Sequence, residues 1–317
     1  MLIREILKNI FSITDYGATH HKITLCGIRF KFPRVEYSKK RKTNLYYFYK
    51  KNNVDITTIP PAQGQVRDIQ LANLALLQEL DYVCQESNLK YWIDFGTLLG
   101  AIRHKGFIPW DDDIDVGMLR QDYEKIIAAF EKYSRNTNIY ADFVRSAKNT
   151  CQYYIKIQHR KCQNLFVDIF PYDFYGDCLS KEEQLKITLK IKGIRKSLQR
   201  HCKLGMPDKE IKDAIDASLK KVILKERKTE KSDLVWGLDF NHGWKNWLYN
   251  YDTIFPLNKI EFEGKMFKCI NKPEEFLKEV YGDYMAYPNK IGVGHSMYAY
   301  LGSEEKQAIE ELIQVLR

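Results

Sequence analysis

The sequence predicts an α+β fold in which helices flank a mixed sheet. Segments with the alternation of strands and segments with the spacing of helices follow one another without a regular βαβ repeat. Two stretches, residues 22–32 and 259–270, alternate in the manner of hairpins. Hydrophobic residues make up 44% of the 317 residues and charged residues 29%, the composition of a globular protein able to bury a core.

The first 60 residues predict a basic N-terminal arm. "KITLCGIRFKF" (22–32) alternates apolar and basic residues, as a half-exposed strand or hairpin does. "SKKRK" (38–42) breaks this pattern and begins an expected linker that ends near "IPPAQGQ" (59–65). We therefore predict an arm and linker over residues 1–60 and one domain over residues 61–317.

The next hundred residues predict helices and strands in irregular order. From Val66 to Val83 apolar residues recur mostly at three-residue steps, which indicates a helix with a broad buried face. "KYWIDFG" reads as a strand ending at Gly96, and "TLLGAIRHKG" as a short helix from Thr97 to Gly106. The remaining expected elements are a strand "DIDVGML", a helix "RQDYEKIIAAFEKY", and two strands, "CQYYIKIQHR" and "NLFVDIFPYDF".

The second half predicts a basic helical insertion over residues 181–235. Ser180 and Glu183 fit a capping box that opens a helix to about Cys202, and a second helix over about 207–229 starts at Pro207. A hairpin "KIEFEGKMFKCI", a helix "KPEEFLKEVYG" and a final helix "SEEKQAIEELIQVL" follow.

The charge is unevenly distributed along the chain. Residues 1–53 hold 12 Lys and Arg against 3 Asp and Glu, and residues 181–231 hold 16 against 8, within a net charge of +9. Such segments suit a polyanion or an anionic membrane surface, or are solvated helix faces. The seven scattered cysteines, the lack of an 18-residue apolar run and the charged N-terminus predict a cytoplasmic protein without disulfides, membrane span or cleaved signal.

The stretch "FIPWDDDIDVG" (107–117) predicts a metal site. On a strand, Asp113 and Asp115 would point to one face and Ile114 and Val116 to the other. Two carboxylates held this close repel each other, and a bound divalent cation neutralises this repulsion. Oxygen ligands of this kind suit Mg²⁺ or Mn²⁺.

Three other interpretations compete for this stretch. An EF-hand loop would match Asp111, Asp113 and Asp115, but Val116 occupies the position that requires glycine. An acidic surface turn without function, and a sugar-nucleotide DxD site of a glycosyltransferase, remain open.

The residues around the acidic stretch favour phosphoryl chemistry. Gly96 and Thr97 lie at an expected strand-to-helix turn, where backbone N–H groups and a helix N-terminus can approach a phosphate. A Gly–Thr turn before two spaced aspartates resembles the nucleotidyltransferase superfamily, in which a later strand supplies a third carboxylate. Asp168, which alternates with the apolar Val167 and Ile169 on an expected strand, is the candidate for this third carboxylate.

A longer resemblance narrows the family. "YWIDFGTLLGAIRHKGFIPWDDDIDVGM", followed by "RQDYEKI", "VDIFPYD" and "FLKEVYGDYMAYPNK", closely resembles the signature of the LicD family, which includes fukutin and fukutin-related protein. The resemblance implies a nucleotidyltransferase-type fold. It also implies transfer of a phospho-alcohol such as phosphocholine from a CDP-linked donor to a glycan hydroxyl, in cell-surface polysaccharide or lipopolysaccharide biosynthesis, with release of CMP.

Roles for individual residues follow from the motifs and the resemblance together. Asp113, Asp115 and Asp168 are expected to bind the metal and act in catalysis. Asp111 and Asp112 are expected to support these ligands or to be structural, and Asp94 could be either. The residues expected to bind substrate or phosphate are Gly96, Thr97, Arg103, His104, Lys105 and Lys156, with Tyr281 and His295 added by the resemblance alone.

Two further functions stay open beside this one. The chain could transfer a nucleotide to another acceptor, or it could be a catalytically silent member of the fold that binds polyanions. No nucleic-acid recognition motif is present, so nucleic acid is not an expected partner. The expected partners are the CDP-linked donor, a glycan or lipid-linked glycan, and an anionic membrane touched peripherally from the cytoplasm through the basic segments.

Overall fold

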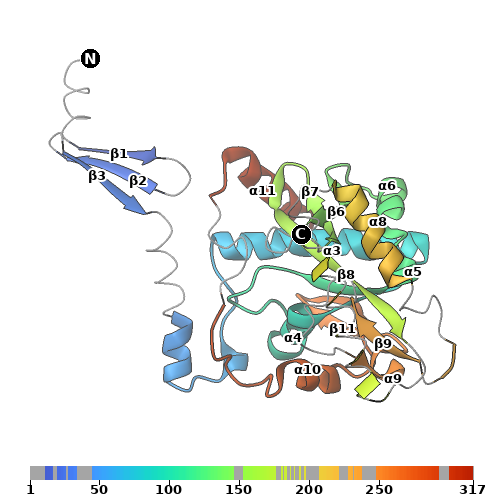
Figure 1. Ribbon diagram of the computed structural model, residues 1–317. Helices are drawn as coiled ribbons and strands as arrows, with labels where there is room; N and C mark the ends of the chain where they lie inside the picture. Colours follow the sequence, from blue (N-terminus) through green and yellow to red (C-terminus); the bar gives the residue numbers. More distant parts are fainter. Residues whose placement is uncertain are drawn as a thin grey trace.

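The computed structural model describes most of the chain (Figure 1). Residues 11–16, 20–25 and 28–33 are described as backbone. Side chains are described for most of residues 45–145, 153–174, 207–220, 228–237, 248–292 and 300–316, and for single positions between 180 and 197. His295, expected at the site, lies outside the described residues.

A seven-stranded mixed sheet forms the centre of the fold. Its strands run in the order β10-β9-β8-β5-β4, while β7 also pairs with β8 and β6 pairs with β7. The strands are β4 (Tyr91–Ile93), β5 (Asp115–Leu119), β6 (Ile139–Arg145), β7 (Tyr153–His159), β8 (Cys162–Tyr175), β9 (Asp233–Trp236) and β10 (Leu248–Tyr249). Only the pairing of β5 with β8 is parallel among these described strands. The predicted α+β class is confirmed.

One face of the sheet packs on the long helix α3 (Gln65–Ser87), which crosses the middle of the molecule in Figure 1. Burial alternates along β7, where Ile155 and Ile157 are fully buried and Lys156 between them is not. Val167 and Ile169 of β8 join the same core as the apolar side chains of α3. Since side chains alternate, the residues between these apolar positions project from the opposite face of the sheet.

Shorter helices surround this centre. They are α4 (Phe95–His104), α5 (Arg120–Tyr123), α6 (Ile126–Tyr133), α8 (Asp208–Leu219), α9 (Tyr251–Ile254), α10 (Pro273–Tyr281) and α11 (Ser303–Leu316). The predicted hairpin near residue 260 is present as β11 (Asn258–Phe262) and β12 (Lys265–Cys269). The predicted capping box is also present, since Ser180 N and Oγ both donate to Glu183 Oε2 at 2.8 Å.

Several element bounds differ from those the sequence predicts. The predicted helix over residues 120–133 is two helices, because Lys125 N bonds to Asp122 O in a tight three-residue turn. The predicted helix after Pro207 is described only to Leu219. Strand β5 starts at Asp115 and not at Asp113 as predicted. The neighbouring strand β4 is short, and the last backbone hydrogen bond between the two runs from Asp94 N to Asp115 O.

The N-terminal arm contains more structure than predicted. The expected hairpin is β2 (His20–Leu25) with β3 (Ile28–Pro33), and β1 (Phe11–Tyr16) pairs with β2 to make a three-stranded sheet. Within the expected linker, residues 45–51 are helical and Ile56–Thr58 form a 3-10 turn, η1. Tyr46 Oη donates to Pro109 O at 2.9 Å, so this helix packs beside the acidic stretch. The division at residue 60 stays a prediction.

Among the helices described, none is both long and apolar enough to cross a bilayer.

Candidate active site

Three charged side chains form a row across the centre of the sheet. Asp115 of β5 and Asp168 of β8 are direct register partners, and Lys156 of β7 is the partner of Asp168 on its other side. Lys156 Nζ lies 2.6 Å from Asp168 Oδ1, and only 12% and 13% of the two side chains are exposed. The lysine also lies over the Phe166 ring at 3.5 Å. The structure thus brings together Asp115, Asp168 and Lys156, three of the predicted residues.

The acidic loop before β5 lies beside this row. One carboxylate oxygen from each of Asp111, Asp112 and Asp113 lies within 4.8 Å of the others. A Cβ added to Gly96 would be 3.4 Å from Asp111 Oδ2 and 3.9 Å from Asp115 Oδ2, so both carboxylates border the same glycine. Asp111, expected from the sequence to have only a supporting role, therefore belongs to the acidic cluster.

Buried polar side chains of α3 hold the acidic loop in place. Gln70 Nε2 donates to Asp111 O at 2.7 Å, and Asn73 Nδ2 donates to Asp112 O at 2.6 Å. Asn73 Oδ1 accepts from Phe166 N at 2.9 Å, two residues before Asp168. Gln70 and Asn73 are fully buried. Sequence reasoning missed both, although two amides on the apolar face of a helix are a signal that could have been followed.

The turn before α4 differs in detail from the predicted one. The helix begins at Phe95, whose φ of +37° is strained for a non-glycine residue, and Asp94 caps it by accepting from Phe95 N at 2.9 Å. Gly96 therefore lies inside the first turn. Thr97 Oγ1 accepts from Asp115 N at 2.8 Å and so joins α4 to the start of β5.

Burial and mutual repulsion raise the pKa values of these carboxyl groups. The pKa of Asp115 lies well above its usual value because the group is desolvated and has Asp113, Asp168 and Asp111 nearby. Burial, and then Asp113, raise the pKa of Asp111 in the same way. The cluster is therefore a place where a cation would be strongly favoured.

Asp94 is a separate buried carboxyl on the same turn. Burial raises its pKa to about 7, although hydrogen bonds from the Tyr172 hydroxyl and Phe95 N oppose this shift. Tyr172 Oη donates to Asp94 Oδ2 at 2.7 Å. These contacts give Asp94 a structural role as the N-cap of α4.

The three basic residues at the end of α4 lie in different surroundings. Arg103 is buried, and its Nη1 donates to Tyr284 O at 2.8 Å. His104 Nε2 accepts from Arg103 Nε at 3.0 Å, and burial, with Arg103 beside it, lowers the His104 pKa to about 4. Lys105 is exposed and caps the helix at the end opposite the acidic cluster.

A cavity of about 470 Å³ borders the acidic cluster. Gly96, Arg103, Trp110, Asp111 and Tyr281 are among the residues that line it. Tyr281, at the end of α10, is 43% exposed. The pKa of its hydroxyl is nevertheless raised well above the usual value by desolvation and by nearby carboxylates, Asp115 first among them. The structure thus places Tyr281 at the same cavity as Gly96 and Arg103.

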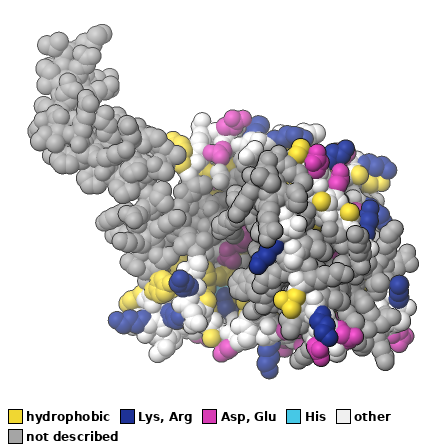
Figure 2. All heavy atoms as spheres, in the orientation of Figure 1, with side chains coloured by type: hydrophobic (Ala, Val, Ile, Leu, Met, Phe, Trp, Pro, Cys, Tyr) yellow, Lys and Arg dark blue, Asp and Glu magenta, His cyan; other side chains and the backbone are white. Residues whose placement is uncertain are grey.

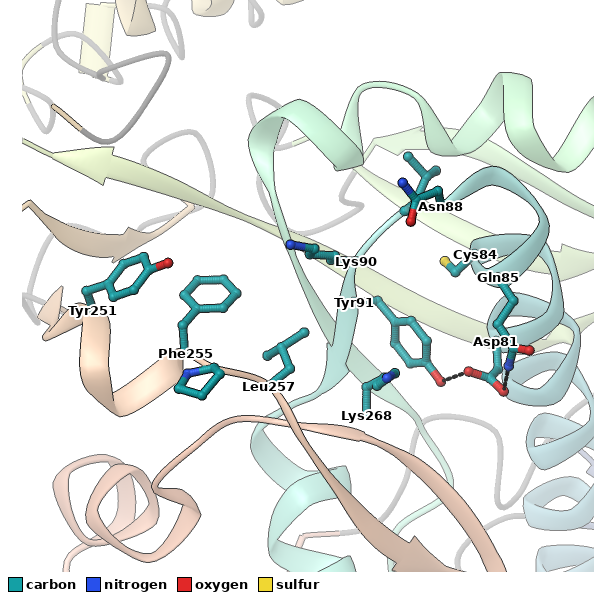
Figure 3. A pocket seen from close by; sticks show the side chains of 12 residues that line it. Asp81, Cys84, Gln85, Asn88, Lys90, Tyr91, Tyr251, Phe255, Leu257 and Lys268 are labelled. Carbon is teal, nitrogen blue, oxygen red and sulfur yellow. Dashed lines mark hydrogen bonds between the residues drawn. The ribbon is translucent and has the colours of Figure 1, made fainter.

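A second cavity, of about 600 Å³, lies between the end of α3 and residues 251–257 (Figure 3). Asp81 accepts there from Tyr91 Oη at 2.7 Å and from Gln85 Nε2 at 2.6 Å. Lys90 and Lys268 also line it. None of the predicted site residues lines this cavity, so the smaller cavity is the one connected to the acidic cluster.

The acidic cluster fits a divalent metal ion. Its donors are carboxylate oxygens, which Mg²⁺ and Mn²⁺ prefer. They are half-buried or buried, mutually repelling, and held by a loop whose backbone is fixed from α3. The residues present therefore suit the ion that the sequence predicts.

Comparison with known proteins places the chain in a family. Residues 88–204 match the LicD/FKTN/FKRP nucleotidyltransferase domain, a span that contains Asp94, the acidic loop, Asp115 and Asp168. The lipopolysaccharide cholinephosphotransferase LicD of Haemophilus influenzae is 29% identical over 252 residues, which are 70% of this chain and 92% of that protein. The chain belongs to the LicD family.

More distant relatives are similar over shorter spans. The ribitol 5-phosphate transferase FKRP of Homo sapiens is 28% identical over 103 residues, 32% of this chain and 21% of that protein. The ribitol-5-phosphate transferase FKTN of Mus musculus is 38% identical over 58 residues, 18% of this chain and 13% of that protein. The LicD family membership expected from the sequence is therefore confirmed.

Proposed function

We propose that this LicD family protein is a phosphotransferase in glycan modification. It would move a phospho-alcohol of the phosphocholine type from a CDP-linked donor to a hydroxyl group of a cell-surface polysaccharide or lipopolysaccharide. The observation that carries the proposal is the alignment of Asp115 with Asp168, beside the acidic loop and Gly96. The relatives, a cholinephosphotransferase and ribitol phosphate transferases by name, support this reaction class.

Asp113, Asp115 and Asp168 would hold Mg²⁺ or Mn²⁺, with Asp111 as a further donor. When bound, such an ion neutralises the charge that develops on phosphate oxygens during transfer. The protein's own part is to keep the carboxylates fixed and ionised. Lys156 does this for Asp168, because an ammonium group 2.6 Å away favours the carboxylate form.

The transfer would be a direct displacement at the donor phosphorus, without a covalent enzyme intermediate. The acceptor oxygen forms a bond to the donor phosphorus that bears the alcohol, and the bridging P–O bond breaks to release CMP. We assign the hydroxyl proton to Asp168, the carboxylate that can give up its contact with Lys156 as it takes the proton. Arg103, which lines the adjoining cavity, would face the negative charge of the leaving CMP.

Gly96 and Thr97 would seat the donor phosphates. The absence of a side chain at Gly96 leaves room beside Asp111 and Asp115. The Thr97 hydroxyl accepts from Asp115 N and keeps its own proton to donate. The roles of His104, Lys105 and His295 stay predictions, as do a cytoplasmic location and contact with lipid-linked glycan.

The test is release of CMP from a panel of CDP-alcohols, including CDP-choline and CDP-ribitol, with Mg²⁺, with Mn²⁺ and with EDTA. We expect metal-dependent CMP from at least one donor, and loss of at least about a hundredfold in Asp115→Asn, because charge stabilisation of several kcal/mol is removed. The exposed Asp252→Asn variant is the control. Metal-independent turnover would refute the assignment. Pyrophosphate release from a nucleoside triphosphate would instead indicate nucleotide transfer.

A further inference from the structure

The helix over residues 45–51 carries apolar side chains on two faces. At 100° per residue, Tyr46 and Tyr49 share the inward face, where they pack against the hydrophobic core. Leu45, Tyr47 and Phe48 lie around the rest of the helix and are 47%, 41% and 59% exposed. An isolated exposed apolar residue needs no explanation, but a cluster of three on two helical turns does.

This cluster stands out in the part of the chain that the structure describes. Nine large hydrophobic side chains there are exposed, and three of them belong to these seven residues. Figure 2 shows hydrophobic and basic side chains side by side at the lower left, over this helix. The cluster is therefore a candidate contact surface and not random exposure.

The helix presents this surface from a fixed position. The Tyr46 ring packs on Trp110 with centroids 5.0 Å apart, and Lys50 Nζ donates to Pro288 O at 2.7 Å. Tyr287 Oη donates to Val54 O at 3.0 Å just beyond the helix. Since Trp110, Tyr287 and Pro288 also line the 470 Å³ cavity, the exposed surface adjoins the wall of the candidate active site.

Charge decides which partner fits the surface. Lys51 is exposed on the same side as Tyr47 and Phe48, and "KKRK" (39–42) precedes the helix in sequence. The first 53 residues carry 12 Lys and Arg against 3 Asp and Glu. Aromatic and aliphatic side chains beside an excess of lysine are the combination that binds the interface of an anionic bilayer, where each basic residue adds about 1 kcal/mol.

We propose that Leu45, Tyr47, Phe48 and Lys51 form a docking surface for an anionic lipid membrane. Docking does not depend on the chemistry proposed above. Its consequence for catalysis rests on that proposal: the wall of the cavity would be held close to the bilayer, where a lipid-linked glycan acceptor would lie.

The experiment is flotation of the full chain with vesicles of phosphatidylcholine alone or with 30% phosphatidylglycerol, at about 50 mM and about 500 mM salt. We expect binding to the anionic vesicles that weakens at high salt. The double variant Leu45→Ser/Phe48→Ser should bind at least about tenfold more weakly, because the inserted apolar area is lost. The matched control Met266→Ser/Val315→Ser, on two exposed residues elsewhere, should bind as wild type does.

Three outcomes would overturn the proposal. These are wild type that stays unbound at low salt, a Leu45/Phe48 variant that binds as tightly as wild type, and wild-type self-association that this variant abolishes while lipid binding persists. Circular dichroism establishes that each variant is folded. CMP release in detergent, without vesicles, should be the same in wild type and variant, so failure of docking and failure of the proposed reaction can be told apart.

Discussion

Asp115 and Asp168 face each other as register partners on the only two parallel strands among those described in the central sheet. Register partners on neighbouring strands project from the same face of a sheet, so the two carboxylates belong to one face and one site. Lys156 extends the row on the far side of Asp168, and the exposed Asp142 of β6 is the register partner of Lys156. The row thus contains both half-buried and exposed carboxylates, which makes a controlled comparison possible.

We predict that Asp115→Asn and Asp168→Asn are strongly non-additive. Each should lower CMP release by at least about a hundredfold, and the double variant should be little worse than the poorer single variant, because the groups act as a unit. Asp142→Asn, in the same row but exposed, should retain full activity. If the two losses multiply, the shared-site interpretation is wrong.

Asn73 should act as a positioning residue for the metal ligands. It joins the acidic loop to β8 through Asp112 O and Phe166 N, and both of these hydrogen bonds are buried. Asn73→Ala should lower the free energy of unfolding by about 2–4 kcal/mol, since two buried polar groups lose their partner. It should also weaken Mn²⁺ binding by about 10–100-fold.

Mn²⁺ affinity measured by electron paramagnetic resonance separates positioning from mere stability. Asn271→Ala, which removes a 2.9 Å bond from Asn271 Nδ2 to Asp252 O far along the chain from the acids, is the matched control and should leave the affinity unchanged. An Asn73→Ala protein that is less stable but binds Mn²⁺ normally would show that the asparagine is only structural.

Gly117→Ala should destabilise the fold through packing. A Cβ at this position of β5 would come within 2.4 Å of Cε2 and Nε1 of the fully buried Trp92, which has no room to move. We expect a loss of about 1–3 kcal/mol in chemical denaturation, the usual cost of overpacking. Gly292→Ala, where an added Cβ would meet nothing within 4 Å, is the control. Equal stability of the two variants would contradict the close Trp92 contact.

The sequence predicted well what depends on local periodicity. The face of α3, the hairpin β11–β12 and the alternation around Asp168 follow from the spacing of apolar residues. Which strands pair does not follow from spacing. The row from Asp115 to Lys156 depends on the pairing of β5 with β8, in which Asp115 lies opposite Asp168, some 50 residues later in the sequence. Only the step from Asp168 to Lys156 joins strands that are neighbours in the sequence.

The acidic loop shows why the remainder was missed. Asp113 was expected on a strand, but Gln70 and Asn73 hold residues 111 and 112 from α3, about 40 residues earlier. Hydrogen bonds over that separation leave no local pattern in the loop itself. The helix over residues 45–51 was missed for a similar reason, since its inward tyrosines are explained only by the distant Pro109 and Trp110.

Asp94 provides a test that depends on pH. Burial raises its folded-state pKa to about 7, above the ordinary value of 3.8. A carboxyl with a raised folded-state pKa contributes stability that is fully present below about pH 4 and is lost as the pH rises through about 7. Asp94→Asn keeps a similar shape and cannot ionise, and an asparagine still caps a helix.

We therefore predict that Asp94→Asn gains stability relative to wild type as the pH rises from 5 to 8. The measurement is urea denaturation in EDTA at several pH values, with the difference between the two proteins plotted against pH, so that the other buried carboxyls cancel. Asp252→Asn, which replaces an exposed aspartate, should follow wild type at every pH. A difference between Asp94→Asn and wild type that stays constant from pH 5 to pH 8 would mean that Asp94 is already ionised in the folded protein at pH 5, and that the hydrogen bonds from Tyr172 and Phe95 outweigh its burial.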